Sequence, residues 1–149
     1  MRGAFAGITA AAAWIAAEPV LQRAFGTHSY SVVRLLGRPL ARRHWRPAGI
    51  ALHLANGALA GVAFQRSGLR GWKAGVVAFQ LEGVATWPGM ALADRLHPDR
   101  GEPDWPSLFR NARVLGHEAA GHAVFGFVLG LLLRRPAVKF LTVSESRPA

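Results

Sequence analysis

The sequence predicts an all-α integral membrane protein, a four-helix bundle made of two tandem transmembrane hairpins. Three observations predict this fold. Hydrophobic residues make up 51% of the 149 residues, four long intervals are almost free of charge, and the 18 Lys and Arg gather mainly between those intervals. A soluble basic domain would be less apolar. Basic and aromatic residues do not interleave on one face, so the net charge of +10 does not predict a nucleic-acid partner.

The four intervals each have the roughly 20 residues that a membrane span needs. They cover residues 3–22, 47–65, 74–93 and 114–133. Only Glu18 interrupts the first, the second has no formal charge, and the third carries Glu82 alone. A helix of a soluble bundle would show charged residues along its outer stripe, which none of the four does. We therefore expect a single transmembrane domain over residues 1–149.

The N-terminal interval has a second interpretation. Met1-Arg2 followed by an alanine-rich run resembles a short signal peptide, which would be removed from the mature protein. The internal repeat described below favours keeping this interval as a membrane helix.

The two long connections are both rich in charge. Residues 23–46 mix arginines with Val and Leu, so this segment could lie along an anionic lipid surface or form a solvated basic loop. Residues 94–113 hold four acidic residues and four arginines, whose formal charges cancel. The Lys and Arg bias of the short loops and flanks weakly favours cytoplasmic termini.

A shift of 69 positions aligns the second half of the chain with the first. His53-x-x-x-Gly57-x-x-x-Gly61 then falls on His122-x-x-x-Gly126-x-x-x-Gly130. The same shift matches Pro19 with Pro88, His28 with His97, and Arg66 with Arg135. The repeat units cover about 3–66 and 72–135. Because each unit holds an even number of spans, the halves enter the membrane in the same orientation, with a pseudo-two-fold axis along its normal.

Every predicted span carries a Gly-x-x-x-Gly pair. The first and third spans begin with Gly3/Gly7 and Gly71/Gly75, which correspond one residue out of register. In lipid, small residues four apart allow two helix backbones to approach closely and gain van der Waals contact. Four such pairs predict a tightly packed bundle.

Ionisable groups within spans are costly, so they are expected to be functional or paired in the bundle interior. The candidates are Glu18, His53, Glu82, His117, Glu118 and His122, with Asn56 as a neutral companion. Counting along the helices places His53 and His122 at similar depth, whereas Glu82 lies nearer the middle of its span.

Three interpretations of these residues remain open. In the first, His53 and His122 bind a haem between two diagonal helices. In the second, Glu18, His117 and Glu118 contribute to a divalent-metal site, although the histidines of 117–122 are five residues apart and not four, as a His-Glu-x-x-His metalloprotease requires. In the third, the polar groups hydrogen-bond across helices or titrate as a proton-responsive pair.

No pattern in the sequence indicates an enzyme. There is no phosphate-binding glycine loop and no Gly-x-Ser-x-Gly elbow, and the chain lacks cysteine. We expect a non-enzymatic membrane factor or a subunit of a larger complex. A haem- or metal-binding protein and a proton-coupled transporter component that uses Glu82 are the alternatives. The bilayer with its anionic headgroups is the expected partner, together with a second copy or another subunit.

The chain resembles the YagU-type family of small bacterial inner-membrane proteins. The resemblance rests on residues 3–19, which end in Trp14-x-x-x-Glu18-Pro19, on residues 72–88, and on residues 121–135 with Gly121-His122. It covers roughly two-fifths of the chain and implies a multi-pass inner-membrane protein without an assigned activity. It carries over no catalytic residue.

Overall fold

The computed structural model describes residues 1–134, which form six α-helices and no strand. The helices are α1 (Arg2–Phe25), α2 (Val32–Leu40), α3 (Trp45–Arg66), α4 (Gly71–Thr86), α5 (Gly89–Leu96) and α6 (Ala112–Leu132). The all-α prediction is confirmed for this part of the chain. Three helices, α1, α3 and α6, are long and apolar enough to span a membrane. They coincide with the first, second and fourth predicted intervals. Arg135, the predicted counterpart of Arg66, lies outside the described residues.

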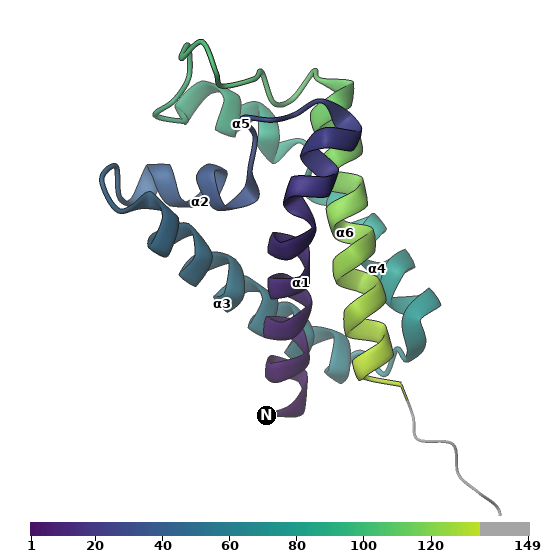
Figure 1. Ribbon diagram of the computed structural model, residues 1–149. Coiled ribbons are helices and arrows are strands. Elements are labelled where there is room, and N and C mark those ends of the chain that lie inside the picture. The colour runs from purple at the N-terminus through teal and green to yellow at the C-terminus, as the bar shows by residue number, and fades with distance from the viewer. Residues whose placement is uncertain (135–149) are drawn as a thin grey trace, which may run out of the picture.

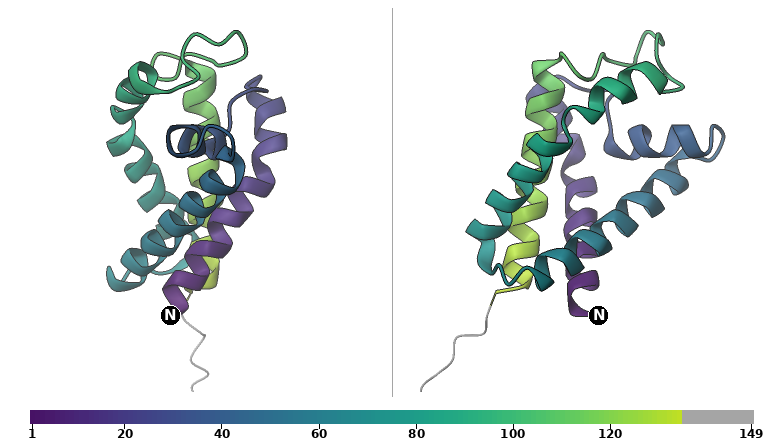
Figure 2. Two further views of the ribbon diagram at one scale, coloured as in Figure 1. Left: turned by 90° about the vertical axis from the view of Figure 1, so that its left-hand side faces the viewer. Right: turned by 180° about the vertical axis from the view of Figure 1, so that it is seen from behind.

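The third predicted interval, 74–93, is not one continuous helix. It is divided between α4, which ends at Thr86, and α5, which begins at Gly89. Pro88 has no backbone N–H to continue the helical ladder, and the N–H of Met90 instead bonds the Trp87 carbonyl three residues back (2.9 Å). The chain therefore bends between the two helices (Figure 2). With 16 residues, α4 is about 24 Å long, less than the roughly 30 Å of a hydrocarbon core.

The helices pack as two pairs joined along one side. Helix α1 packs against α3, α4 packs against α6, and α1 also packs against α6 (Figure 1). Helix α2 crosses over the beginning of α3, and α5 with the connection 97–111 lies at the same end of the molecule. The N-terminus of α1 and the end of α6 lie at the opposite end. Although α3 and α4 are consecutive, they diverge and pack little against each other.

Glycines set the spacing within both helix pairs. A Cβ added at Gly7 of α1 would collide with the backbone carbonyl of Gly57 in α3. In the other pair, a Cβ added at Gly75 of α4 would collide with the carbonyl of Gly126 in α6. The predicted close packing through glycine pairs is therefore present in α1–α3 and in α4–α6. Each contact is backbone against backbone, so neither side can yield by rotating a side chain.

The basic connection 23–46 contains a folded helix. Ser31 begins α2, because its hydroxyl accepts a hydrogen bond from the N–H of Val33 (3.1 Å). Val32 and Val33 are buried, and a Cβ at Gly37 would collide with the Trp45 carbonyl at the beginning of α3. The segment is therefore neither a solvated loop nor a free surface helix along its whole length, because one face of α2 packs on α3.

We predict that Gly7→Ala and Gly75→Ala each destabilise the fold by about 1–3 kcal/mol, because the added methyl group must push two backbones apart. Gly89→Ala is the matched control. Nothing lies within 4 Å of a Cβ added at Gly89. Thermal unfolding in detergent measures the difference. Equal midpoints for the Gly7 variant and the Gly89 control would contradict the packing described here.

Candidate functional site: a cavity between the helix pairs

A cavity of about 730 Å³ lies where α3 and α4 diverge. Its walls come from α3 and α4, its floor includes Trp14 of α1 and residues of α6, and α2 and α5 contribute residues at its margin. Most of the lining is apolar, with Leu36, Leu59, Phe79 and Phe125 among the larger side chains. A cavity of this size is large enough for a small ligand or one chain of an amphiphile.

Five of the polar residues singled out in the sequence line this one cavity. They are His53 and Asn56 from α3, Glu82 from α4, and Glu118 and His122 from α6. Glu18 and His117 do not line it. Side chains from three different helices thus converge on one apolar space, an arrangement typical of small-molecule binding sites.

Trp14 lies between the two histidines. Its ring contacts that of His53 edge-on, with centroids 5.2 Å apart, and contacts that of His122 at 4.8 Å. A Cβ added at Gly121 of α6 would collide with the same indole ring. His53 and His122 therefore lie at the same level of the bundle, as predicted, with the indole filling the space between them.

His122 is held at both ring nitrogens. Its Nε2 pairs with the Glu82 carboxylate (2.9 Å), and its Nδ1 bonds the Glu118 backbone carbonyl (2.8 Å). The Glu82 side chain keeps 49% of its surface exposed. The cavity therefore has a carboxylate–imidazole pair at its wall, open to whatever fills the space.

The geometry does not fit haem ligation by His53 and His122. The macrocycle would need the space that the Trp14 ring occupies, and both nitrogens of His122 already have partners. A metal site from Glu18, His117 and Glu118 does not fit either, since each of these side chains bonds a different partner. Within residues 1–134 no three His, Asp or Glu side chains are grouped so that they could hold a metal ion.

Glu18 and His117, together with Glu118 at the cavity wall, instead form a buried polar layer next to the cavity. The segment 27–32 supplies one hydrogen-bond partner each to His117 and Glu118 and two to Glu18. Thr27 Oγ1 bonds His117 Nδ1 (2.7 Å), the Tyr30 hydroxyl donates to Glu118 Oε1 (2.7 Å), and the Ser31 hydroxyl donates to Glu18 Oε2 (2.7 Å). The N–H of Val32 also donates to Glu18 Oε1 (2.6 Å). These bonds tie the α1–α2 connection to α1 and α6.

Tyr30 is the centre of this layer. Its side chain is fully buried and meets the His117 ring edge-on at 5.2 Å. Burial raises the pKa of the Tyr30 hydroxyl well above its usual value, and the adjacent Glu118 carboxylate raises it further. Tyr30 therefore stays a neutral hydrogen-bond donor.

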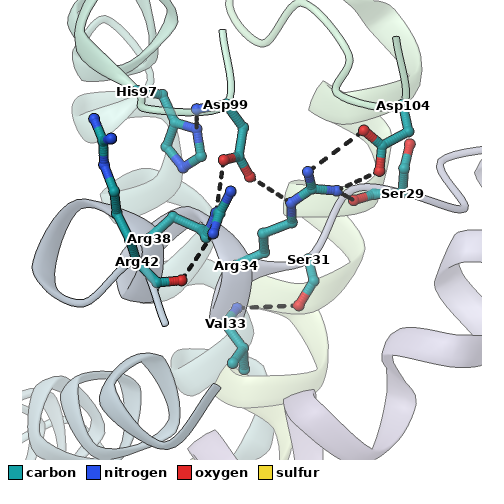
Figure 3. Close-up of polar contacts among 9 residues, drawn as sticks. All are labelled: Ser29, Ser31, Val33, Arg34, Arg38, Arg42, His97, Asp99 and Asp104. Carbon is teal, nitrogen blue, oxygen red and sulfur yellow. Dashed lines mark hydrogen bonds and ion pairs between the residues drawn. The ribbon is translucent and has the colours of Figure 1, made fainter. Parts of the chain in front are cut away.

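A cluster of ion pairs joins α2 to the connection 97–111 (Figure 3). Asp99 is fully buried and accepts from Arg34 Nε and from Arg38 Nε, each at 2.6 Å. Arg34 also pairs with Asp104 (2.8 Å), and its guanidinium lies 4.9 Å from the centre of the Trp105 ring. We call Asp99, Arg34 and Arg38 the α2 latch.

The acidic residues of the connection 94–113 do not pair with the arginines of the same connection. The sequence predicted only that the formal charges within this connection cancel. Asp99 and Asp104 instead pair with arginines of α2, and Asp94 accepts from the backbone N–H groups of Leu108 and Phe109. The formal charges still cancel, but the pairing is with another segment.

Comparison with protein-family models, curated proteins and solved structures finds no match to this chain. The fold and the site therefore stand on their own geometry.

Sequence reasoning missed the partners of the candidate residues. Thr27, Tyr30 and Ser31 were not singled out, although five hydrogen-bonding residues in a row, Thr-His-Ser-Tyr-Ser, follow Gly26 at the end of α1. The α2 latch was also missed, because it joins residues more than 60 positions apart.

We predict that Asp99→Asn destabilises the fold by about 2–3 kcal/mol. The change leaves Arg34 and Arg38 without their shared carboxylate. The loss is smaller than the roughly 3–5 kcal/mol of a fully buried pair because both arginines keep some solvent contact. Asp104→Asn is the control, since its side chain is 63% exposed and should matter little. Equal unfolding midpoints for the two variants would show that the α2 latch contributes nothing.

The ion pairs of Asp99 also predict that the stability of the fold depends on pH. Burial alone would raise the pKa of Asp99, but hydrogen bonds and charge from Arg34 and Arg38 outweigh it and hold that pKa below its usual value. A carboxyl whose pKa is depressed on folding adds stability above its unfolded pKa, about 3.9, and this stability is lost as the pH falls further. We expect the stability difference between wild type and Asp99→Asn to be constant near neutral pH and to shrink below about pH 4. A difference that persists at lower pH would contradict this.

Proposed function

We propose that this protein is a multi-pass protein of the cell inner membrane whose four long helical segments form two tandem hairpins. The hairpins are α1 with α3, and the bent α4–α5 segment with α6. The contact of Gly7 with Gly57 and that of Gly75 with Gly126 support this assignment. The 69-position shift places Gly57 on Gly126. It places Gly7 one residue after Gly75, which is the same offset that the sequence pattern shows. Cytoplasmic termini and membership of the YagU-type family stay predictions.

The outer surface supports a lipid environment. Large apolar side chains that do not line the cavity are exposed on the long helices, among them Phe5, Val20, Ile50, Val77, Leu81 and Phe127. Apolar exposure spread over several helices is typical of a surface that faces acyl chains and is unusual for a soluble monomer.

We infer that the protein acts without catalysis and holds an amphiphilic molecule in the cavity between α3 and α4. One observation carries this inference: an apolar cavity of about 730 Å³ that gathers Asn56, Glu82 and His122 at its wall. Apolar walls suit an acyl or isoprenoid chain, and these polar groups can both donate and accept hydrogen bonds. The expected ligand therefore has a neutral, hydrogen-bonding end.

The repeat suggests why the cavity is there. Trp14 fills the interface between α1 and α6, and the 69-position shift places Gly83 at the equivalent position of α4. A Cβ added at Gly83 would point toward the His122 ring at 3.2 Å, much as Trp14 contacts His53. The shift relates α1 to α4 and α3 to α6, so the interface between α3 and α4 corresponds to the interface between α1 and α6. It lacks the tryptophan that fills the α1–α6 interface, and the space remains for a ligand.

We predict that a brominated monoacylglycerol quenches Trp14 fluorescence in the purified protein. Bromine quenches on contact, and Trp14 lines the cavity floor. Trp14→Phe should remove the larger part of the quenching, and the Trp14→Phe/Trp87→Phe double variant should remove the rest, because Trp87 also lines the cavity. Ala60→Phe narrows the cavity and should weaken quenching at least several-fold, whereas Ala55→Phe, on the same helix but outside the lining, should not. Equal quenching of the two Phe variants would exclude this cavity as the binding site.

A second candidate function is proton-coupled transport through Glu82. The pair between Glu82 and His122 favours it, since a half-exposed carboxylate beside an imidazole in a cavity can exchange protons. Glu82→Gln should abolish proton-coupled flux in proteoliposomes, because a glutamine amide cannot take up and release the proton that a carboxylate carries. Unchanged flux would remove Glu82 from that role.

Association with a second copy or with another membrane subunit completes the proposal. The exposed apolar surface of α4, with Val77 and Leu81 four residues apart and outside the cavity lining, can face lipid or a partner helix.

A further inference from the structure

We propose that a second, polar cavity beside α5 binds the phosphate group of an anionic ligand. This cavity measures about 500 Å³ and is formed by residues of α5 and of the connection 97–111. Three arginines line it, Arg95, Arg100 and Arg110. The inference is independent of the ligand proposed for the cavity between α3 and α4.

The three arginines have no acidic partner among residues 1–134. None of them takes part in an ion pair within 4.0 Å in this part of the chain. Two neighbouring carboxylates, Asp99 and Asp104, pair with the arginines of α2 (Figure 3), and a third, that of Glu102, does not line the cavity. Because Asp99 and Asp104 pair with α2, the three cavity arginines keep their positive charge without a neutralising partner in this part of the chain.

One carboxylate does line the cavity, that of Asp94. Its oxygens accept from the N–H of Leu108 (2.6 Å), the N–H of Phe109 (3.0 Å) and the Ser107 hydroxyl (3.3 Å). Asp94 is therefore committed to shaping the backbone at 107–109. Three guanidinium groups against one engaged carboxylate give the cavity a net positive charge, which favours an anion.

The wall that carries the arginines is held in place. Trp105, which lines the cavity, stacks face to face on His97 with ring centroids 4.3 Å apart and planes 7° apart. The Arg34 guanidinium of the α2 latch lies over the same Trp105 ring. The contacts of His97 and Arg34 with Trp105 hold the backbone of the connection in place. Binding an anion therefore requires ordering of the arginine side chains but not of the backbone.

Guanidinium groups suit phosphate because their planar forks donate two parallel hydrogen bonds to its oxygens. Each basic residue near an anionic surface contributes on the order of 1 kcal/mol, which corresponds to about fivefold in affinity. The segments that line the cavity, α5 and the connection 97–111, lie at the end of the molecule that holds α2, next to the beginning of α6 (Figure 1). In the proposed topology this end is at headgroup level, so the phosphate can come from an anionic lipid or from a free phosphate compound.

The test compares two triple variants of the full chain in a neutral detergent. Arg95→Gln/Arg100→Gln/Arg110→Gln removes the cavity arginines. Arg42→Gln/Arg43→Gln/Arg46→Gln removes the same charge from the segment between α2 and the first turn of α3, outside the cavity. Each protein is titrated with dioctanoyl phosphatidylglycerol and, separately, with inorganic phosphate, and binding is followed by microscale thermophoresis.

We expect the cavity triple to weaken phosphatidylglycerol binding by more than tenfold and the control triple to weaken it by less than threefold, because only the former removes arginines of the site. Loss confined to phosphatidylglycerol identifies a lipid headgroup as the source. Parallel loss for inorganic phosphate identifies a free phosphate compound. Equal weakening by both triples, or no binding of either probe to wild type, overturns the proposal.

A single variant guards against misfolding of the triple. The Arg110 side chain makes no hydrogen bond or ion pair to residues 1–134 that folding could depend on, so Arg110→Gln should keep the wild-type unfolding midpoint. We expect it to weaken binding about fivefold. Wild-type affinity in this variant would overturn the proposal even if the triple variant fails to fold.

Discussion

The backbone contacts at the glycine pairs are the constraint on which the rest of the structure depends. Gly7 against Gly57 and Gly75 against Gly126 bring each pair of helices closer than any larger residue allows. In the proposed membrane topology, where apolar burial gives helices little reason to associate, this close contact supplies the attraction. Two tight pairs can then meet along α1 and α6 and still diverge along α3 and α4, which is where the cavity lies.

The opposite end is stabilised by polar contacts. The carboxylates of Glu18 and Glu118 are both buried, and burying such groups without partners costs several kcal/mol each. The segment 27–32 offsets part of that cost by giving each of them a hydrogen-bond donor. The same segment leads directly into α2, so one short stretch of chain both satisfies the buried acids and positions the helix that carries the α2 latch. Small residues thus hold one part of the bundle and hydrogen bonds the other.

The sequence predicted the features that depend on local pattern. Apolar length located α1, α3 and α6, glycine spacing predicted the close helix pairs, and the scarcity of charge within spans singled out the polar residues that line the cavity. It did not predict features that depend on distant partners. The α2 latch joins Arg34 to Asp99, and no local pattern indicates that an acidic residue of one connection will choose an arginine of another. The bend at Pro88 was missed because the presence of a proline does not decide it: Pro19, its counterpart, lies within the continuous helix α1.

The cofactor hypotheses show the same limit. His53 and His122 were correctly expected at one level of the bundle, but equal depth says nothing about what lies between two side chains. The indole of Trp14 lies there, and it comes from a third helix. Periodicity within one helix can predict which face of the helix carries a residue. Which side chain packs against that face depends on how the other helices are arranged.

Tyr30 is the chain's single tyrosine, and its place in the buried polar layer makes it a natural spectroscopic probe. Tyrosinate absorbs at longer wavelength than the neutral phenol, so the absorbance of this protein in alkaline solution reports on one hydroxyl alone. Because that hydroxyl is enclosed and bonded to Glu118, its ionisation requires the layer that joins the α1–α2 connection to α6 to open. The optical titration of the intact protein therefore measures how often this end of the bundle opens, without any label.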